Sequence, residues 1–344
     1  MATQTPDPGI IDLHGHIVLE GSMGTAGWCG PTIGAYDDGT PWFQVGNYRL
    51  DGVGYRNSII GNTDIRLGAM DEQGISLQAL SPNPLTYLHF IDAGLAIDFC
   101  QAHNDDLART VRSHPDRFIG LAALPMQDVP AACRELRRAV RELGLLGGYI
   151  GTDVGRFLDD PSMDELYQTC VDLDVPLFMH PTQSGIDGPL RDPRVRRWDL
   201  DLVLEYSFEE VLAVSTLVFG GVTQRFPTLD ICVSHGGGFT PMGISKLRKV
   251  AERRKAAPSW ISEPGAFDAA LSRLWFDCHI AGPREFEFAL AQLGTERLVF
   301  GTNFGGWDKG TGPDVTALRT TLNANAIRLT RLDQRAPQLA ARFG

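Results

Sequence analysis

Eight short apolar runs recur along this chain, and they restrict the possible folds more than any other feature. Each run ends in small or chemically reactive residues. The runs cover residues 9–18, 76–83, 117–126, 146–154, 175–182, 229–238, 273–280 and 297–306. Between them lie segments with helical spacing of apolar residues, such as the segment that carries Leu95, Phe99 and Leu107. The pattern therefore predicts alternating strands and helices, which is typical of a parallel sheet.

Eight strand–helix units in one chain favour a closed (β/α)8 TIM barrel over an open doubly wound sheet. No linker rich in Pro, Ser or Gly divides the units, so we expect a single domain over residues 1–344. Residues 19–62 break the pattern, because they are rich in Gly, Asp and aromatic side chains. A connection this long in a compact domain is usually functional. We therefore expect an insertion after the first strand that covers the barrel mouth, with a plain surface excursion as the alternative.

The charge balance excludes several kinds of partner. A net charge of −11 disfavours nucleic acid and anionic membranes, because both require clustered positive charge. The six cysteines lie far apart without a CxxC pair, which is typical of reduced thiols in a cytoplasmic protein. The N-terminal MATQTPDPG has no signal-peptide pattern, and no apolar run approaches the length of a membrane span. We expect a small-molecule ligand.

Five histidines occupy the places where a barrel carries its chemistry, at the C-terminal ends of strands. His14 and His16 are two residues apart in the first run, so side-chain alternation directs both into the mouth. His180, His235 and His279 end the fifth, sixth and seventh runs. Three glycines follow His235, and we expect them to let a substrate approach the backbone. Two converging neutral imidazoles form half of a divalent-metal site, for which zinc is the first expectation and manganese the second.

The motifs around these residues resemble a known family. DLHGH, the HP of the fifth run, SHGGG and FGTN are similar to motifs of the amidohydrolase superfamily, in the branch of aminocarboxymuconate-semialdehyde decarboxylase and related aromatic-acid decarboxylases. The resemblance extends from about residue 9 to residue 308 and includes the segments IRLGAMDEQGISLQALS and FGGVTQRFPTLDICVSHGGG. It implies a metal-dependent barrel. Most members remove CO₂ from unsaturated or aromatic acids without an organic cofactor, and hydrolases and hydratases are relatives.

The resemblance also implies roles for individual residues. His14, His16 and His180 would bind the metal, and His235 would be the acid/base residue. An anionic carboxylic acid substrate requires cations, and Arg56 and Arg49 lie in the insertion that is expected to flank the mouth. His279 and Phe304 are further candidates for substrate contact. By analogy with relatives, we expect a homodimer or a dimer of dimers.

Asn303 departs from the family pattern, which has an aspartate in a GTD or GSD motif. An asparagine keeps an oxygen that can ligate a metal, but it has no useful pKa and cannot act as a base. Reactions that need a base beside the metal should therefore suffer most, which disfavours hydrolysis relative to decarboxylation. Asp308 is a candidate substitute, although its position beyond Gly305, Gly306 and Trp307 argues against that role.

Three explanations of Asn303 remain open from the sequence. The natural protein uses Asn303 with His235 handling the proton, the chain is an Asp-to-Asn variant made to trap a ligand, or the site is inactive. Separately, three functions remain open. They are a metal-dependent carboxy-lyase, a lactone or C–C bond hydrolase or hydratase on the same barrel, and, if the site is inactive, a binding protein. Asn303 is therefore both a candidate metal ligand and a candidate catalytic residue.

Overall fold

Parallel strands form a closed barrel in the computed structural model, which describes residues 9–308 and 312–343. The third strand of the barrel is split into two short pieces, β6 and β7. The barrel strands are β1 Ile10–Ile17, β5 Ile75–Pro82, β6 Phe118–Gly120, β7 Ala122–Ala123, β8 Gly148–Gly151, β9 Leu177–His180, β10 Ile231–Val233, β11 Trp275–Asp277 and β12 Leu298–Val299.

Backbone hydrogen bonds close this sheet into a ring. Neighbouring strands pair in parallel in the order β1-β5-β6 and β7-β8-β9-β10-β11-β12. Leu121 lies between β6 and β7 and still donates to β5 at 2.9 Å. At the other edge, Leu13 donates to Phe300 O at 2.9 Å and His16 donates to Phe304 O at 2.7 Å. The predicted eight-stranded barrel is confirmed.

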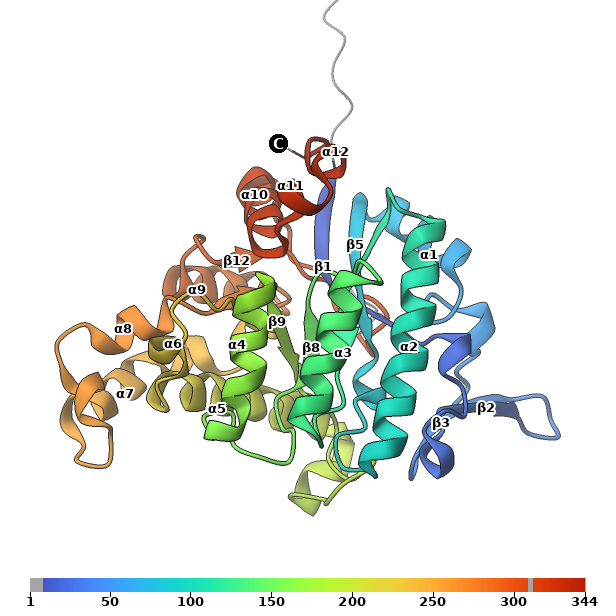
Figure 1. Cartoon of the computed structure of the whole chain (residues 1–344), viewed down its shortest axis with the longest axis horizontal. Coiled ribbons are helices and arrows are strands. Elements are labelled where there is room, and N and C mark those ends of the chain that lie inside the picture. Colours follow the sequence, from blue (N-terminus) through green and yellow to red (C-terminus); the bar gives the residue numbers. More distant parts are fainter. Residues whose placement is uncertain (1–8, 309–311, 344) are drawn as a thin grey trace, which may run out of the picture.

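Helices cover the outside of the barrel, and Figure 1 shows α2, α3 and α4 side by side on one side of the barrel. The α2 helix begins where the Asp92 side chain accepts hydrogen bonds from the N–H groups of Gly94 and Leu95. Its buried face carries Phe99 and Leu107. The helices are α1 Thr63–Glu72, α2 Ala93–Ser113, α3 Val129–Arg141, α4 Asp164–Leu173, α5 Tyr206–Phe219, α6 Val222–Arg225, α7 Thr240–Arg253, α8 Ala266–Leu271, α9 Pro283–Leu293, α10 Arg319–Thr330, α11 Leu332–Arg335 and α12 Pro337–Ala340.

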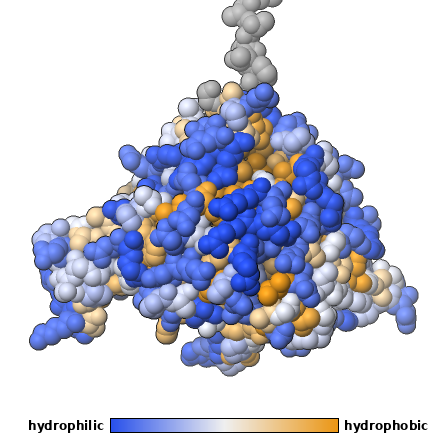
Figure 2. All heavy atoms as spheres, in the orientation of Figure 1, coloured by the Kyte–Doolittle hydropathy of each residue, from blue (hydrophilic) through white to orange (hydrophobic). Residues whose placement is uncertain are grey.

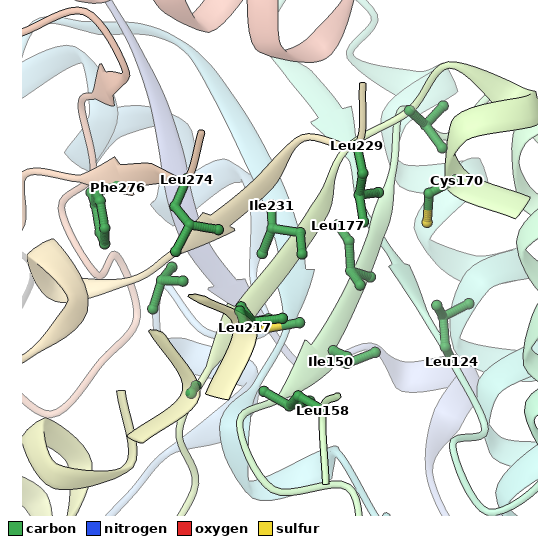
Figure 3. Close-up of a cluster of buried hydrophobic side chains, with 14 of the residues drawn as sticks. Leu124, Ile150, Leu158, Cys170, Leu177, Leu217, Leu229, Ile231, Leu274 and Phe276 are labelled. Carbon is green, nitrogen blue, oxygen red and sulfur yellow. The ribbon is translucent and has the colours of Figure 1, made fainter. Parts of the chain in front are cut away.

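Two apolar layers hold the barrel together. In the outer layer, strand residues such as Leu177 and Ile231 pack with Leu217 of α5 (Figure 3). The inner layer fills the barrel interior with side chains that include Phe178 and Trp275, and residues of α10 to α12 belong to the same cluster. By contrast, the surface over α2, α3 and α4 is mostly hydrophilic (Figure 2). The barrel is thus packed inside, and the C-terminal ends of its strands are where a barrel of this kind carries its site.

The insertion forms a small antiparallel sheet of β2 Thr32–Ala35, β3 Pro41–Val45 and β4 Tyr48–Asp51. Phe43 of this sheet belongs to an apolar cluster with Ile91, which follows β5, and Ile186, which follows β9. Asn47 donates to Ile186 O at 3.3 Å. The insertion therefore packs on loops at the C-terminal ends of barrel strands. That it covers the mouth stays a prediction.

Two further observations concern the chain as a whole. All six cysteines are buried, and none forms a disulfide. Among the helices of the described ranges, none combines the length and apolar character required to cross a membrane.

Candidate metal and acid–base site

Three histidine side chains meet at one point in the mouth of the barrel. His14, His16 and His180 are almost fully buried, and one ring nitrogen from each lies within 4.8 Å of the others. Nε2 of His14 is 3.0 Å from Nε2 of His16. A tetrahedral ion with bonds of about 2.0–2.1 Å requires its nitrogen ligands to be about 3.3 Å apart. The three imidazoles therefore fit a divalent metal ion, as the sequence predicted.

A bulge in β1 directs His14 and His16 inward. Leu13 belongs to the apolar cluster of the barrel interior. Strict alternation after Leu13 would turn the next even-numbered residues toward the helices. The register shift prevents this, because β1 advances from Asp12 to Gly15 while β5 advances only from Gln78 to Leu80. The one extra residue in β1 reverses the side-chain direction after the bulge, so both histidines point into the mouth.

The other nitrogen of each ring faces an oxygen atom. His16 Nδ1 hydrogen-bonds with Pro82 O at 3.2 Å and His180 Nδ1 with Pro181 O at 2.6 Å, whereas His14 Nδ1 lies 2.8 Å from Asp277 Oδ2 without the geometry of a hydrogen bond. The two hydrogen bonds fix the tautomers of His16 and His180 that leave Nε2 free for a metal. In the described part of the chain, the buried Nε2 of His180 has no hydrogen-bond partner, which a bound ion would supply.

Burial also keeps these rings in the form that binds metal. Desolvation, followed by repulsion from neighbouring imidazoles, lowers the pKa of His14 and of His180 well below the usual value. Desolvation, followed by repulsion from His235, lowers the pKa of His16 to about 3. The three rings are therefore neutral near pH 7, and a metal ligand must carry a free lone pair.

Asp277, at the end of β11, joins three of the site histidines and was missed from the sequence. Its Oδ1 accepts hydrogen bonds from the backbone N–H groups of His235 and His279, each at 2.9 Å, while its Oδ2 faces His14. The rule that identified the histidines would have found it, because Asp277 is a polar residue at the end of a buried strand. It holds the sixth and seventh strand ends against His14.

A second buried carboxylate, Asp12, ties β1 to its two neighbouring strands. It accepts from His14 N–H at 3.0 Å, from Gln78 Nε2 at 2.7 Å and from Thr302 Oγ1 at 2.7 Å. Burial raises the pKa of Asp12 to about 6 against these hydrogen bonds. Arg66 of α1 continues the network, because it donates to Gln78 Oε1 at 2.6 Å. The metal histidines thus sit on a hydrogen-bonded frame.

His235 is paired with a buried glutamate that the sequence did not reveal. Its Nδ1 lies 2.6 Å from Oε1 of Glu210, which is fully buried on α5. Burial alone lowers the pKa of His235, but the charges of Glu210, Asp277 and Asp308 outweigh it and raise that pKa. The pair therefore favours a protonated imidazole beside the metal ligands, with ring centroids 5.0 Å from His14 and 4.8 Å from His180.

The last of the three glycines after His235 lies against α5. Gly238 has φ +62°, and a Cβ there would lie 2.4 Å from the backbone oxygen of Ser207. The missing side chains therefore let α5 approach and bring Glu210 under His235. The expectation that they make room for substrate was wrong for Gly238. His235 itself has φ +50°, a left-handed conformation that is uncommon outside glycine and clusters at functional sites.

Asn303 lies beside the same histidine cluster, and Asp308 contacts it. Asn303 is buried with φ +55°, and within the described residues its amide Oδ1 has no hydrogen-bond partner. Its Nδ2 donates to Asp308 Oδ1 at 3.3 Å, and His279 Nε2 is 2.6 Å from Asp308 Oδ2. His279 therefore belongs to the cluster, with its ring 5.4 Å from that of His235. The loop position of Asp308 does not keep it from the site, contrary to the expectation.

Three tyrosines complete the surroundings and were not singled out by the sequence. Tyr149 meets the His16 ring edge-on at 6.2 Å, Tyr206 meets His180 at 5.9 Å, and Tyr87 meets His180 at 6.3 Å. Burial raises the pKa of each hydroxyl above its usual value, so the three remain neutral donors. They offer aromatic faces and hydroxyl groups next to the metal ligands.

Two predicted substrate contacts lie on the insertion. The Arg49 guanidinium bonds to Gln44 Oε1 and lies over the Trp42 ring at 4.4 Å. Arg56 pairs with Glu20 at 2.6 Å, and both side chains are exposed. These contacts hold each arginine within residues 20–56 and do not bring either to the histidines. A role in substrate binding stays a prediction for both.

Phe304, a further predicted substrate contact, is fully buried. Its ring packs under the Arg66 guanidinium at 5.0 Å, and it belongs to the outer apolar layer. Its backbone closes the barrel against β1. The contacts therefore indicate a packing residue, and direct contact with substrate stays a prediction.

Known proteins are similar to this chain over most of its length. A family model described as amidohydrolase matches residues 11–334. A 2-amino-3-carboxymuconate-6-semialdehyde decarboxylase from Dictyostelium discoideum is 29% identical over 86% of this chain and 81% of its own length. A 2-keto-4-carboxy-3-hexenedioate hydratase from a Sphingobium species is 26% identical over 88% of this chain and 85% of its own.

A solved structure supports the fold. The dihydroxybenzoic acid decarboxylase of a Polaromonas species, crystallised with manganese and the inhibitor 2-nitroresorcinol, superposes with a TM-score of 0.71 at 23% identity. The match covers 95% of this chain and 98% of that one.

Proposed function

This chain belongs to the amidohydrolase family, and we propose that it is a divalent-metal-dependent, non-oxidative decarboxylase of a small aromatic or unsaturated cyclic carboxylic acid. One observation carries the proposal. Three neutral histidine nitrogens lie within 4.8 Å of one another, and the His235–Glu210 pair stands next to them as a proton source. The decarboxylases among the similar proteins support the same reaction.

We infer that the ion is manganese or zinc. Three imidazole ligands suit zinc, which was the first expectation from the sequence. The solved Polaromonas decarboxylase holds manganese, which favours Mn²⁺ as the first ion to test. When bound to these histidines, the ion would act as a Lewis acid that binds the substrate oxygens and neutralises their charge.

Residues of the chain carry out the proton transfer. His235, protonated and held at Nδ1 by Glu210, presents Nε2 to the substrate and donates its proton to the carbon that bears the carboxylate. The bond between that carbon and the carboxylate then breaks, CO₂ leaves, and the electron pair of the bond returns to the ring. The neutral His235 regains a proton from solvent. Asn303 offers an amide oxygen as a further ligand, but it takes no part in proton transfer.

Substrate recognition follows from the aromatic surroundings. We propose that Tyr87, Tyr149 and Tyr206 enclose a planar substrate and donate hydrogen bonds to its oxygens, because their buried hydroxyls remain protonated. The insertion at residues 19–62 would form one wall of the mouth, since it packs on the loop that follows His180.

The assay for this proposal is CO₂ release with a panel of hydroxybenzoates and unsaturated cyclic acids. We expect activity with Mn²⁺ or Zn²⁺, at least about a hundredfold loss with a chelator and recovery when the ion is restored. Metal content is measured on the same samples. A chain that binds the ion but releases no CO₂ from any acid of the panel would argue against decarboxylation.

Hydration is the second candidate, because the Sphingobium hydratase aligns with 88% of this chain. Asn303 disfavours it, since addition of water needs a base beside the metal. Mass spectrometry in H₂¹⁸O separates the two reactions. Incorporation of labelled oxygen into a non-carboxylate position of the product would select the hydratase or hydrolase. An inactivated binding protein is disfavoured by the complete histidine cluster.

Glu210→Gln should move the pH dependence of the reaction. His235 donates a proton only below its pKa, so activity is lost as the pH rises through that pKa. The Glu210 charge helps to raise the pKa of His235, and its removal should shift the alkaline limb of kcat toward lower pH by at least about one unit. The pH profile of CO₂ release measures this shift.

Glu209→Gln is the matched control, because Glu209 is the neighbouring helix residue but pairs with Arg191 at 2.8 Å. It should leave the alkaline limb in place. Equal shifts in both variants would contradict the role of Glu210.

We further propose a homodimer or a dimer of dimers in the cytoplasm. The six buried cysteines without disulfides support a reducing compartment. Light scattering of the purified chain tests the subunit number.

A further inference from the structure

We propose that Asp308 supplies the negative charge that position 303 lacks, acting as a positioning residue for Asn303 and His279 beside the metal histidines. This inference rests on the proposed metal site. It concerns a residue that lies outside the family motif, five positions beyond Asn303.

A tight turn brings Asp308 back to the site. Gly305 has φ +84°, and the N–H of Gly306 donates to Asn303 O at 2.7 Å. A Cβ on Gly306 would lie 2.5 Å from Cγ of Asn303, so a side chain there would displace the Asn303 amide. The two glycines that separate Asp308 from the motif are therefore what folds the chain back on Asn303.

The contact between Asp308 and Asn303 fixes the amide. Only Nδ2 of Asn303 can donate, and it does so to Asp308 Oδ1 at 3.3 Å. The amide oxygen is then the atom left for the histidines, and among the described residues this buried oxygen has no hydrogen-bond partner. Asp308 thus orients the Asn303 side chain so that the amide Oδ1 is the atom available to an ion.

The same carboxylate orients His279. Its Oδ2 lies 2.6 Å from Nε2 of His279, which fixes the tautomer with the proton on Nε2. The backbone N–H of His279 is held by Asp277, so backbone and ring are both anchored to carboxylates. Asp308 therefore contacts two site residues that come from different strand ends.

Charge explains why Asn303 and Asp308 occur together. An aspartate at 303 would place a second carboxylate where the amide now donates at 3.3 Å, and two like charges at that distance repel. Among the described residues, the group within 4.8 Å comprises the three histidines alone, and Asp308 lies outside it. Its charge acts through Asn303 and His279.

The test is the Mn²⁺ affinity of the purified full chain, measured by competition with a chromophoric chelator in the absence of substrate. We expect Asp308→Asn to raise the Kd for Mn²⁺ by roughly tenfold or more. This is the usual effect of losing a residue that orients the metal ligands. In an Asn303→Asp background, the same change should alter Kd by less than about threefold, because residue 303 then carries the charge. Asp308→Ser provides a second removal of the charge, and unfolding curves show which variants are folded.

Asp314→Asn is the matched control, because Asp314 is exposed in the same loop region and caps Thr316 at 3.0 Å. Equal effects of the Asp308 and Asp314 changes, or equal effects of Asp308→Asn in both backgrounds, would overturn the inference. Wild-type chain that binds no Mn²⁺ would instead remove the proposed metal site itself. CO₂ release by the wild type is measured separately and tests the proposed reaction.

Discussion

Replacing His180 with alanine should abolish stoichiometric metal binding and lower kcat/KM for CO₂ release by at least about a thousandfold, because a bound ion contributes several kcal/mol of charge stabilisation. His180 is one of three ligands and the only one from β9, so its loss leaves the two neighbouring nitrogens of β1. Elemental analysis and single-turnover CO₂ release measure the two effects on the same preparation.

A histidine outside the cluster provides the control. His114 follows α2 and packs edge-on against Phe118 at 5.7 Å. His114→Ala should leave metal content and activity within about twofold, since surface changes rarely exceed 0.5 kcal/mol. A His180→Ala protein that keeps one ion per chain and full activity would exclude the proposed metal centre.

His235→Asn should reduce kcat by about 10²- to 10⁴-fold while metal content stays unchanged, because loss of a general acid costs that much. Asparagine keeps a hydrogen-bonding group of similar reach but has no proton to transfer near neutral pH. Elemental analysis separates this variant from the ligand variants, and KM should change less than kcat if His235 acts mainly in the transition state.

The outcome also identifies the donor. If His235→Asn retains most of the wild-type kcat, the proton comes from another group, and His279 with its Asp308 partner is the next residue to test. Loss of metal together with activity would show that His235 supports the ion instead of the proton transfer.

The sequence predicted the barrel and the histidine cluster for related reasons. Apolar runs with helical segments between them determine a parallel barrel, and such a barrel gathers the residues at its strand ends in one place. His14, His16, His180 and His235 could therefore be brought together from the printed sequence. Asp277 obeys the same rule and was overlooked.

Glu210 carried no comparable signal. It lies on the inner face of α5, in a segment whose sequence is typical of an ordinary helix. The close approach of that helix to Gly238 is what brings Glu210 under His235. The arginines of the insertion illustrate the reverse case. Their charge fits an acidic substrate, yet the contacts of Arg49 and Arg56 are with residues of the insertion itself.

By itself, the sequence determined the class of fold, the three imidazoles and the missing carboxylate at 303, because strand periodicity and residue type are local properties. The tertiary structure alone decided how β1 turns both histidines inward, which carboxylates lie against them, and that Asp308 returns to Asn303. These features depend on the one-residue bulge in β1, on the packing of α5 against Gly238 and on the turn at Gly305 and Gly306. Each of them is fixed by contacts between segments far apart in the chain or by backbone angles that residue type alone does not specify.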